Sequence, residues 1–168
     1  MSQPEKSGCT DVVFTRNLSI GAHLVTKRPG YLHHGIYIGN GRVIHYAGLS
    51  RSLARGPIEA VSIEHFSAGS GFQVVPHPHA QYTGLEVARR AASRLGEQDY
   101  RLLTNNCEHL CLWCVIGQRK SDQVDACIRN PARALRVLLT LFVYVLIRDR
   151  MLASLARTLD VPFPALNG

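Results

Sequence analysis

A chain of 168 residues suits one domain with a hydrophobic core and at most a short appendage. Its formal net charge of +7 favours anionic partners, either nucleic acid or anionic lipid headgroups. The sequence has no zinc-finger spacing, no RNA-recognition aromatic motif and no dense Lys/Arg run, so a nucleic-acid partner is not expected.

The cysteines argue against a disulfide-bonded secreted protein. Their number is odd, and three of the five fall in one predicted helix, which favours a reducing, cytoplasmic setting. Residues 1–10 are polar, are expected to be disordered, and lack the apolar core of a secretory signal. The five cysteines are Cys9, Cys107, Cys111, Cys114 and Cys127.

Residues 31–47 predict a β-hairpin, because two β-rich runs flank residues 39–41. A two-residue loop would put His33 and His45 on opposite faces of the ribbon. A three-residue loop would put both on one face, with His45 opposite Gly35. We expect the three-residue loop, because it ends in a left-handed residue and its last glycine adopts that conformation at no steric cost.

Shorter signals surround this hairpin. A basic turn at 27–30 should end the first strand, and a polar basic loop is expected at 47–56. His77-Pro78-His79 predicts a solvated loop, since two metal ligands without a third are weak support for a metal site. Strands are predicted at 20–26, 57–62, 72–75 and 100–103, with a helical turn at 63–66.

A helix is predicted from Thr83 to a stop at Gly96. Thr83 and Glu86 have the spacing of a capping box, in which each side chain binds a free backbone N–H of the first turn. The expected apolar stripe is Leu85, Ala88, Ala92 and Leu95, and Arg89, Arg90 and Arg94 are expected on a solvated face.

A second helix is predicted to begin at Cys107, with Asn106 as its N-cap. The helix dipole would lower the pKa of a thiol there and make the thiolate, which is the nucleophile, available near neutral pH. The alternative is a small buried hydrophobe. We interpret Cys111 and Cys114 as core residues, because ligands confined to one helix cannot easily complete a tetrahedral zinc site.

Residues 135–147 form an apolar segment flanked by arginines. The eleven residues between Arg136 and Arg148 would reach about 16 Å as a helix, against about 30 Å of bilayer hydrocarbon. The segment could be a core helix, a dimer or partner helix, or an interfacial anchor, so residues 135–150 could support peripheral membrane association. The flanking arginines are Arg129, Arg133, Arg136, Arg148, Arg150 and Arg157.

A cysteine at a helix start and two histidines on one face of a hairpin make a nucleophile, a base and an orienting group. We assign Cys107 as nucleophile, His33 as general base and His45 as the orienting residue. The backbone N–H of Cys107 is a natural oxyanion donor. His34 is the poorer base, since a regular strand would turn it to the opposite face.

The boxes H-H-G-I-Y-I-G-N-G-R-V-I-H at 33–45 and N-C-E-H at 106–109 resemble those of the lecithin:retinol acyltransferase family. That family is a permuted branch of the NlpC/P60 papain-like superfamily, and the similarity covers roughly residues 20–118. The resemblance implies an α+β fold, with an antiparallel sheet packed on the nucleophile-bearing helix and an apolar C-terminal helix. Together with the composition, the resemblance divides the chain into a disordered segment at 1–10, a catalytic domain at 11–120 and a basic, apolar helical extension at 121–168.

The resemblance further implies acyl transfer without a cofactor or metal: Cys107 attacks a glycerophospholipid ester and forms a thioester. The family's base matches His33 and its second histidine matches His45, and Tyr31 and Asn106 are secondary site residues. Retinol as an acceptor does not follow. Two alternatives stay open: an amidase or peptidase of the wider superfamily using the same residues, and a non-catalytic module that binds lipid or protein.

Overall fold

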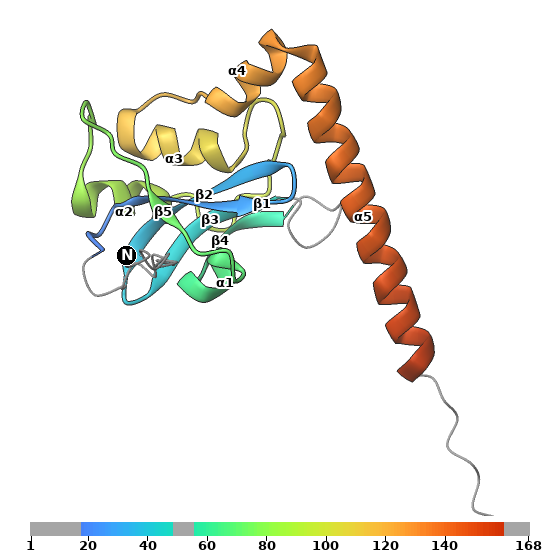
Figure 1. Ribbon diagram of the computed structural model, residues 1–168. Coiled ribbons are helices and arrows are strands. Elements are labelled where there is room, and N and C mark those ends of the chain that lie inside the picture. The colour runs from blue at the N-terminus through green and yellow to red at the C-terminus, as the bar shows by residue number, and fades with distance from the viewer. Residues whose placement is uncertain (1–17, 49–55, 160–168) are drawn as a thin grey trace, which may run out of the picture.

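The computed structural model describes residues 18–48 and 56–159; the segment predicted to be disordered at 1–10 and most of the loop predicted at 47–56 lie outside them. The fold is α+β, as expected: an antiparallel sheet in the order β4-β3-β2-β1-β5 with helices packed against it (Figure 1). The elements are β1 (His23–Arg28), β2 (Tyr31–Gly39), β3 (Arg42–Gly48), β4 (Gly56–Ser62), α1 (Ile63–Ser67), β5 (Gln73–Val74), α2 (Gly84–Ala92), α3 (Cys107–Ile116), α4 (Asp122–Arg129) and α5 (Pro131–Leu159).

The β2–β3 hairpin has the predicted register, with Gly35 opposite His45. The turn itself is tighter than predicted. Gly39 pairs with Arg42, so only Asn40 and Gly41 are unpaired, and both have positive φ, as a tight hairpin turn requires. A register shift between Tyr37 and Gly39 leaves one extra residue in β2. The pairing of Gly35 with His45 is therefore the one that the longer loop would give.

The sheet buries a different core on each face. Ile36, Ile44 and Tyr46 pack against α3. The residues that alternate with them, including Tyr37 and Val43, pack against the α1 side. Figure 1 shows α3 and α1 on opposite sides of the sheet. Gly35 belongs to the α1 face, where an added Cβ would lie 2.5 Å from a Val43 methyl and 2.8 Å from the Phe66 ring.

Two predictions about local structure between β1 and α3 were wrong. Lys27 and Arg28 belong to β1, which shortens the predicted basic turn. Residues 100–103 do not form a strand: a turn there is closed by an isolated bridge between Arg101 and Asn105.

Helix α2 corrects the predicted capping box and apolar stripe. Thr83 is the N-cap residue, but its side chain makes no capping hydrogen bond. The helix buries Val87, Ala88 and Ala91, whereas Leu85 and Leu95 are 54% and 47% exposed. The stripe is therefore rotated by about one residue, which leaves those two leucines at the surface.

The predicted solvated arginine face of α2 is also wrong in part. Arg90 lies over the rings of Tyr82 and Trp113, at 3.9 and 4.1 Å from their centroids. Arg94 is buried and pairs with Glu97. These side chains hold α2 against α3, because a planar guanidinium stacks on aromatic rings while it donates hydrogen bonds.

Helix α3 begins at Cys107, as predicted. The Asn106 side chain accepts from the backbone N–H groups of Glu108 and His109, and His109 completes a capping box. Cys111 and Cys114 are fully buried core residues, also as predicted. The cap positions Cys107 at the start of a helix that packs on β2 and β3.

Helix α5 is longer than the predicted apolar segment and extends away from the sheet (Figure 1). Within the described residues, no helix combines the length and apolar content needed to cross a bilayer. Many apolar side chains of α5 are exposed, for example Leu135, Leu139, Phe142 and Leu146.

Candidate active site

The sheet opens beside α3, at one end of the hairpin. The β1–β2 pairing continues to Arg28 and Tyr31, and β3 stays paired with β4 as far as Gly48. The β2–β3 pairing, however, stops at Gly35 and His45, although both strands continue. The two strands therefore separate and leave a gap between them.

The Cys107 sulfur lies at this gap. The backbone N–H of Tyr37 donates to Ala22 on the β1 side, so the N–H of His34, three residues earlier, points to the β3 side. No β3 residue pairs with His34 there, and its N–H is directed at the Cys107 sulfur instead. The helix start thus places the thiol where the backbone of β2 is unpaired.

His33 and His45 meet at the same opening, from the α1 face. His33 Nε2 lies 2.8 Å from His45 Nδ1, and both rings pack against Phe66. The other ring nitrogen of His45, Nε2, is 3.6 Å from a Glu59 carboxylate oxygen. Among the described residues, no hydrogen bond joins the Cys107 thiol to the His33 ring. The structure therefore brings the two histidines together as predicted.

The resting state of the thiol differs from the expectation. Burial raises the pKa of Cys107 to about 11, and this effect outweighs the lowering by the backbone N–H groups of His34, Glu108 and Cys107 itself. Burial, followed by the charge of His45, holds the pKa of His33 well below its ordinary value. Both directions favour a neutral thiol and a neutral imidazole near pH 7 over a preformed thiolate–imidazolium pair.

His34 belongs to a second histidine network on the α3 face, which the sequence did not predict. His34 Nδ1 lies 2.8 Å from His23 Nε2, and His23 Nδ1 lies 2.8 Å from His77 Nε2. At the other end, His34 Nε2 lies 3.0 Å from the Gln123 side-chain nitrogen. His77, predicted to be in a solvated loop, is half-buried and bonds the buried ring of His23.

Gln123 determines which ring nitrogens donate and which accept in this series of histidine hydrogen bonds. Its side-chain oxygen accepts from the backbone N–H of Leu32, so its nitrogen is the atom that faces His34. His34 Nε2 must then accept, and a neutral ring that accepts at one nitrogen donates at the other. His34 therefore donates to His23, and His23 donates to His77, with all three rings neutral. Burial lowers the pKa of each of these rings, in agreement with this arrangement.

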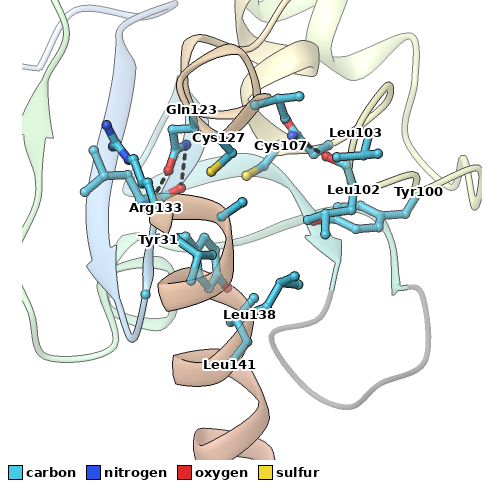
Figure 2. Close-up of a pocket in the computed structure, with 16 residues that line it drawn as sticks. Tyr31, Tyr100, Leu102, Leu103, Cys107, Gln123, Cys127, Arg133, Leu138 and Leu141 are labelled. Atoms are coloured by element: carbon cyan, nitrogen blue, oxygen red, sulfur yellow. Dashed lines mark hydrogen bonds between the residues drawn. The ribbon is translucent and has the colours of Figure 1, made fainter. Parts of the chain in front are cut away.

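A pocket with a volume of about 190 Å³ adjoins Cys107 (Figure 2). Its walls are largely apolar, and Figure 2 shows Tyr31 and Leu138 across the pocket from Cys107. Both predicted secondary residues line it: Tyr31, whose ring centroid is 6.2 Å from that of His33, and Asn106. The pocket gives a buried thiol a route to a substrate.

Several residues of the site carry no signal in the sequence motifs. Glu59 reaches His45 from β4, Phe66 packs on both histidines from α1, and Gln123 joins the start of β2 to α4. Only pairing between distant segments brings these side chains to the site. For Gln123, nothing in the sequence indicated that its side chain would bind the start of β2.

The chain belongs to the lecithin retinol acyltransferase family, whose profile "Lecithin retinol acyltransferase" matches residues 16–120. Mouse "Lecithin retinol acyltransferase" is 30% identical over 133 residues, which cover 62% of this chain and 57% of that protein. Human "Phospholipase A and acyltransferase 2" is 27% identical over 125 residues, covering 65% and 77%, and mouse "Phospholipase A and acyltransferase 3" is 31% identical over 118 residues, covering 61% and 73%. The family is one of acyltransferases and phospholipases; helices α4 and α5 lie beyond the matched range.

Proposed function

We propose that this protein is a cysteine acyltransferase or phospholipase that acts on glycerophospholipid esters through a thioester on Cys107. The observation that carries the proposal is that the Cys107 thiol lies against the backbone N–H of His34 where β2 and β3 separate, one residue along β2 from the His33 ring that bonds His45. Membership of a family of acyltransferases and phospholipases supports the same reaction class.

The charge arrangement favours His33 Nδ1 as the basic atom. A carboxylate 3.6 Å from His45 Nε2 favours a proton on that nitrogen. His45 Nδ1 then accepts from His33 Nε2, which leaves the lone pair of His33 on Nδ1. In this arrangement His45 orients the base and Glu59 sets the tautomer of His45.

The reaction begins from neutral groups. As Cys107 Sγ attacks the ester carbonyl carbon, its proton passes to His33 Nδ1, and the tetrahedral oxyanion receives hydrogen bonds. The N–H of Cys107 is suited to this role, since the Asn106 cap uses the N–H groups of Glu108 and His109. Collapse expels the lysophospholipid alkoxide, which takes the proton back from His33, and leaves an acyl thioester. Water, an amine or an alcohol then takes the acyl group.

Peripheral contact with a membrane surface is part of this proposal. Helix α5 presents exposed apolar residues along one side, including Leu135, Leu139, Phe142 and Leu146, at helical spacing. Exposed arginines flank the first turns of this side, for example Arg129 and Arg136. Such a helix can lie in an anionic interface and bring lipid esters to the pocket.

The test is incubation with phosphatidylcholine vesicles, with and without added anionic phospholipid, followed by mass spectrometry of the intact and digested protein. We expect one acyl adduct on the peptide that holds Cys107, lost in Cys107→Ala. The matched control is Cys127→Ala, which removes the other thiol that lines the pocket and should keep the adduct. A folded protein that forms no adduct with any headgroup, or that cleaves peptides through Cys107 instead, would refute the proposal.

A further inference from the structure

Helices α4 and α5 supply one whole wall of the pocket that holds the nucleophile. Val124 comes from α4, and Ala134, Val137, Leu138 and Leu141 come from α5. The α5 residues have the spacing i, i+3, i+4 and i+7, so they form a single stripe along the helix. Both helices begin after residue 120, where the match to the family ends. This wall is therefore a feature of the present chain's extension.

The opposite wall is apolar as well. Tyr100, Leu102 and Leu103 lie on it, in the turn that precedes Asn106. Leu102, Leu103 and Leu138 remain 43%, 61% and 55% exposed, which is a high exposure for apolar side chains that face one another around a pocket. A hydrocarbon chain inserted between the walls would cover these surfaces, whereas a polar peptide would leave its own groups without partners.

The Cys107 thiol determines where such a hydrocarbon chain would start. Cys107 lines the pocket, so an acyl group bonded to its sulfur begins there and continues between the two walls. Arg133 also lines the pocket and is exposed, which places a cation beside the opening. The geometry points to an acyl-chain site in which the stripe of Val137, Leu138 and Leu141 on α5 determines the preferred length of the transferred chain; this inference rests on the proposed function.

The first experiment measures kcat/KM for p-nitrophenyl butanoate, octanoate and dodecanoate. Each buried methylene should raise kcat/KM roughly three- to fourfold until the pocket is filled. Leu141→Trp, which fills the pocket from α5, should lower the values for the two longer esters at least tenfold and leave the butanoate value within about twofold. Leu138→Trp provides a second variant of the same wall. The control is Leu85→Trp on α2, at an exposed leucine that does not line the pocket, which should keep the wild-type profile.

The second experiment separates this inference from the proposed function. A fluorescent fatty acid is titrated into Cys107→Ala, alone and combined with Leu141→Trp or Leu85→Trp. We expect saturable binding that Leu141→Trp weakens and Leu85→Trp preserves. Binding without any acyl adduct in the wild-type protein would refute the proposed reaction and keep the acyl-chain site. If the acyl adduct forms at a rate that does not depend on acyl-chain length, the acyl-chain site would be overturned and the proposed reaction would stand. The same conclusion would follow if Leu141→Trp and Leu138→Trp left the dependence of kcat/KM on ester length unchanged.

Discussion

His33 and His34 are neighbours in β2, but their rings belong to two separate hydrogen-bond networks with different terminal groups. The His33 ring lies on the α1 face, bonds His45 and ends at the gap where the thiol lies. The His34 ring lies on the α3 face in a chain that has a partner at both ends, His23 and Gln123. A ring whose two nitrogens are both used cannot take another proton without losing a bond. Under the proposed mechanism, availability of a nitrogen, more than closeness in sequence, selects the base.

The largest expected effect separates the two neighbours directly. His33→Gln should lower the rate of Cys107 acylation by about 10²- to 10⁴-fold, because it removes the proposed general base. His34→Gln should reduce stability but change the rate of the folded protein less than about tenfold. Adduct formation, timed by mass spectrometry and normalised to folded protein, measures both. Equal losses in the two variants would remove the distinction between the networks.

The second prediction concerns the protonation state of the thiol. Since the pKa of Cys107 is about 11, the thiolate fraction should rise about tenfold per pH unit below that value. Alkylation by iodoacetamide at Cys107 should therefore increase about a hundredfold between pH 7 and pH 9. A plateau near neutral pH that disappears in His33→Gln would instead show a preformed ion pair and would contradict the neutral resting state.

Smaller effects are expected along the relay behind His33. His45→Gln should lower the acylation rate about tenfold to a hundredfold, because the ring of His33 remains but loses its orientation. Glu59→Gln should have a smaller effect in the same direction, since a neutral amide favours the proton on His45 Nε2 less strongly. A pH–rate profile is the informative measurement. If His45→Gln matched His33→Gln in its loss, the two roles would have to be reassigned.

The smallest effect is on stability and involves both networks. The folded pKa values of His23, His33 and His34 are lowered, so below about pH 6.5 the unfolded chain binds more protons than the folded one. The stability contributed by these neutral rings is present above that pH and is lost as the pH falls toward the folded pKa values. Between about pH 6.5 and its folded pKa, each ring should lower the free energy of unfolding by about 1.4 kcal/mol for each pH unit of acidification.

Thermal unfolding between about pH 7.5 and pH 5 checks this acid sensitivity. His33→Gln and His34→Gln should each make the decline of the unfolding temperature shallower by the contribution of one proton. A pH-independent unfolding temperature in the wild-type protein would mean that these rings are not held neutral.

The sequence by itself determined the local features of the site. Asn106 caps the helix that Cys107 begins, because a cap depends on residues adjacent in the chain. The glycines of the 39–41 turn and the alternation of strand residues placed His33 and His45 on one face, because both depend on short-range backbone geometry. The family, the α+β class and the burial of Cys111 and Cys114 follow from the same motifs and helical spacing.

Only the tertiary structure decided what those residues meet. Whether the thiol is neutral depends on how deeply it is buried, and burial depends on packing between α3 and the sheet. The partners Glu59, Phe66 and Gln123 come from three separate elements, and the pocket needs α5 beside the turn at Leu102. Contacts between segments far apart in the chain leave no short-range pattern, so spacing within one helix or hairpin could not have predicted them.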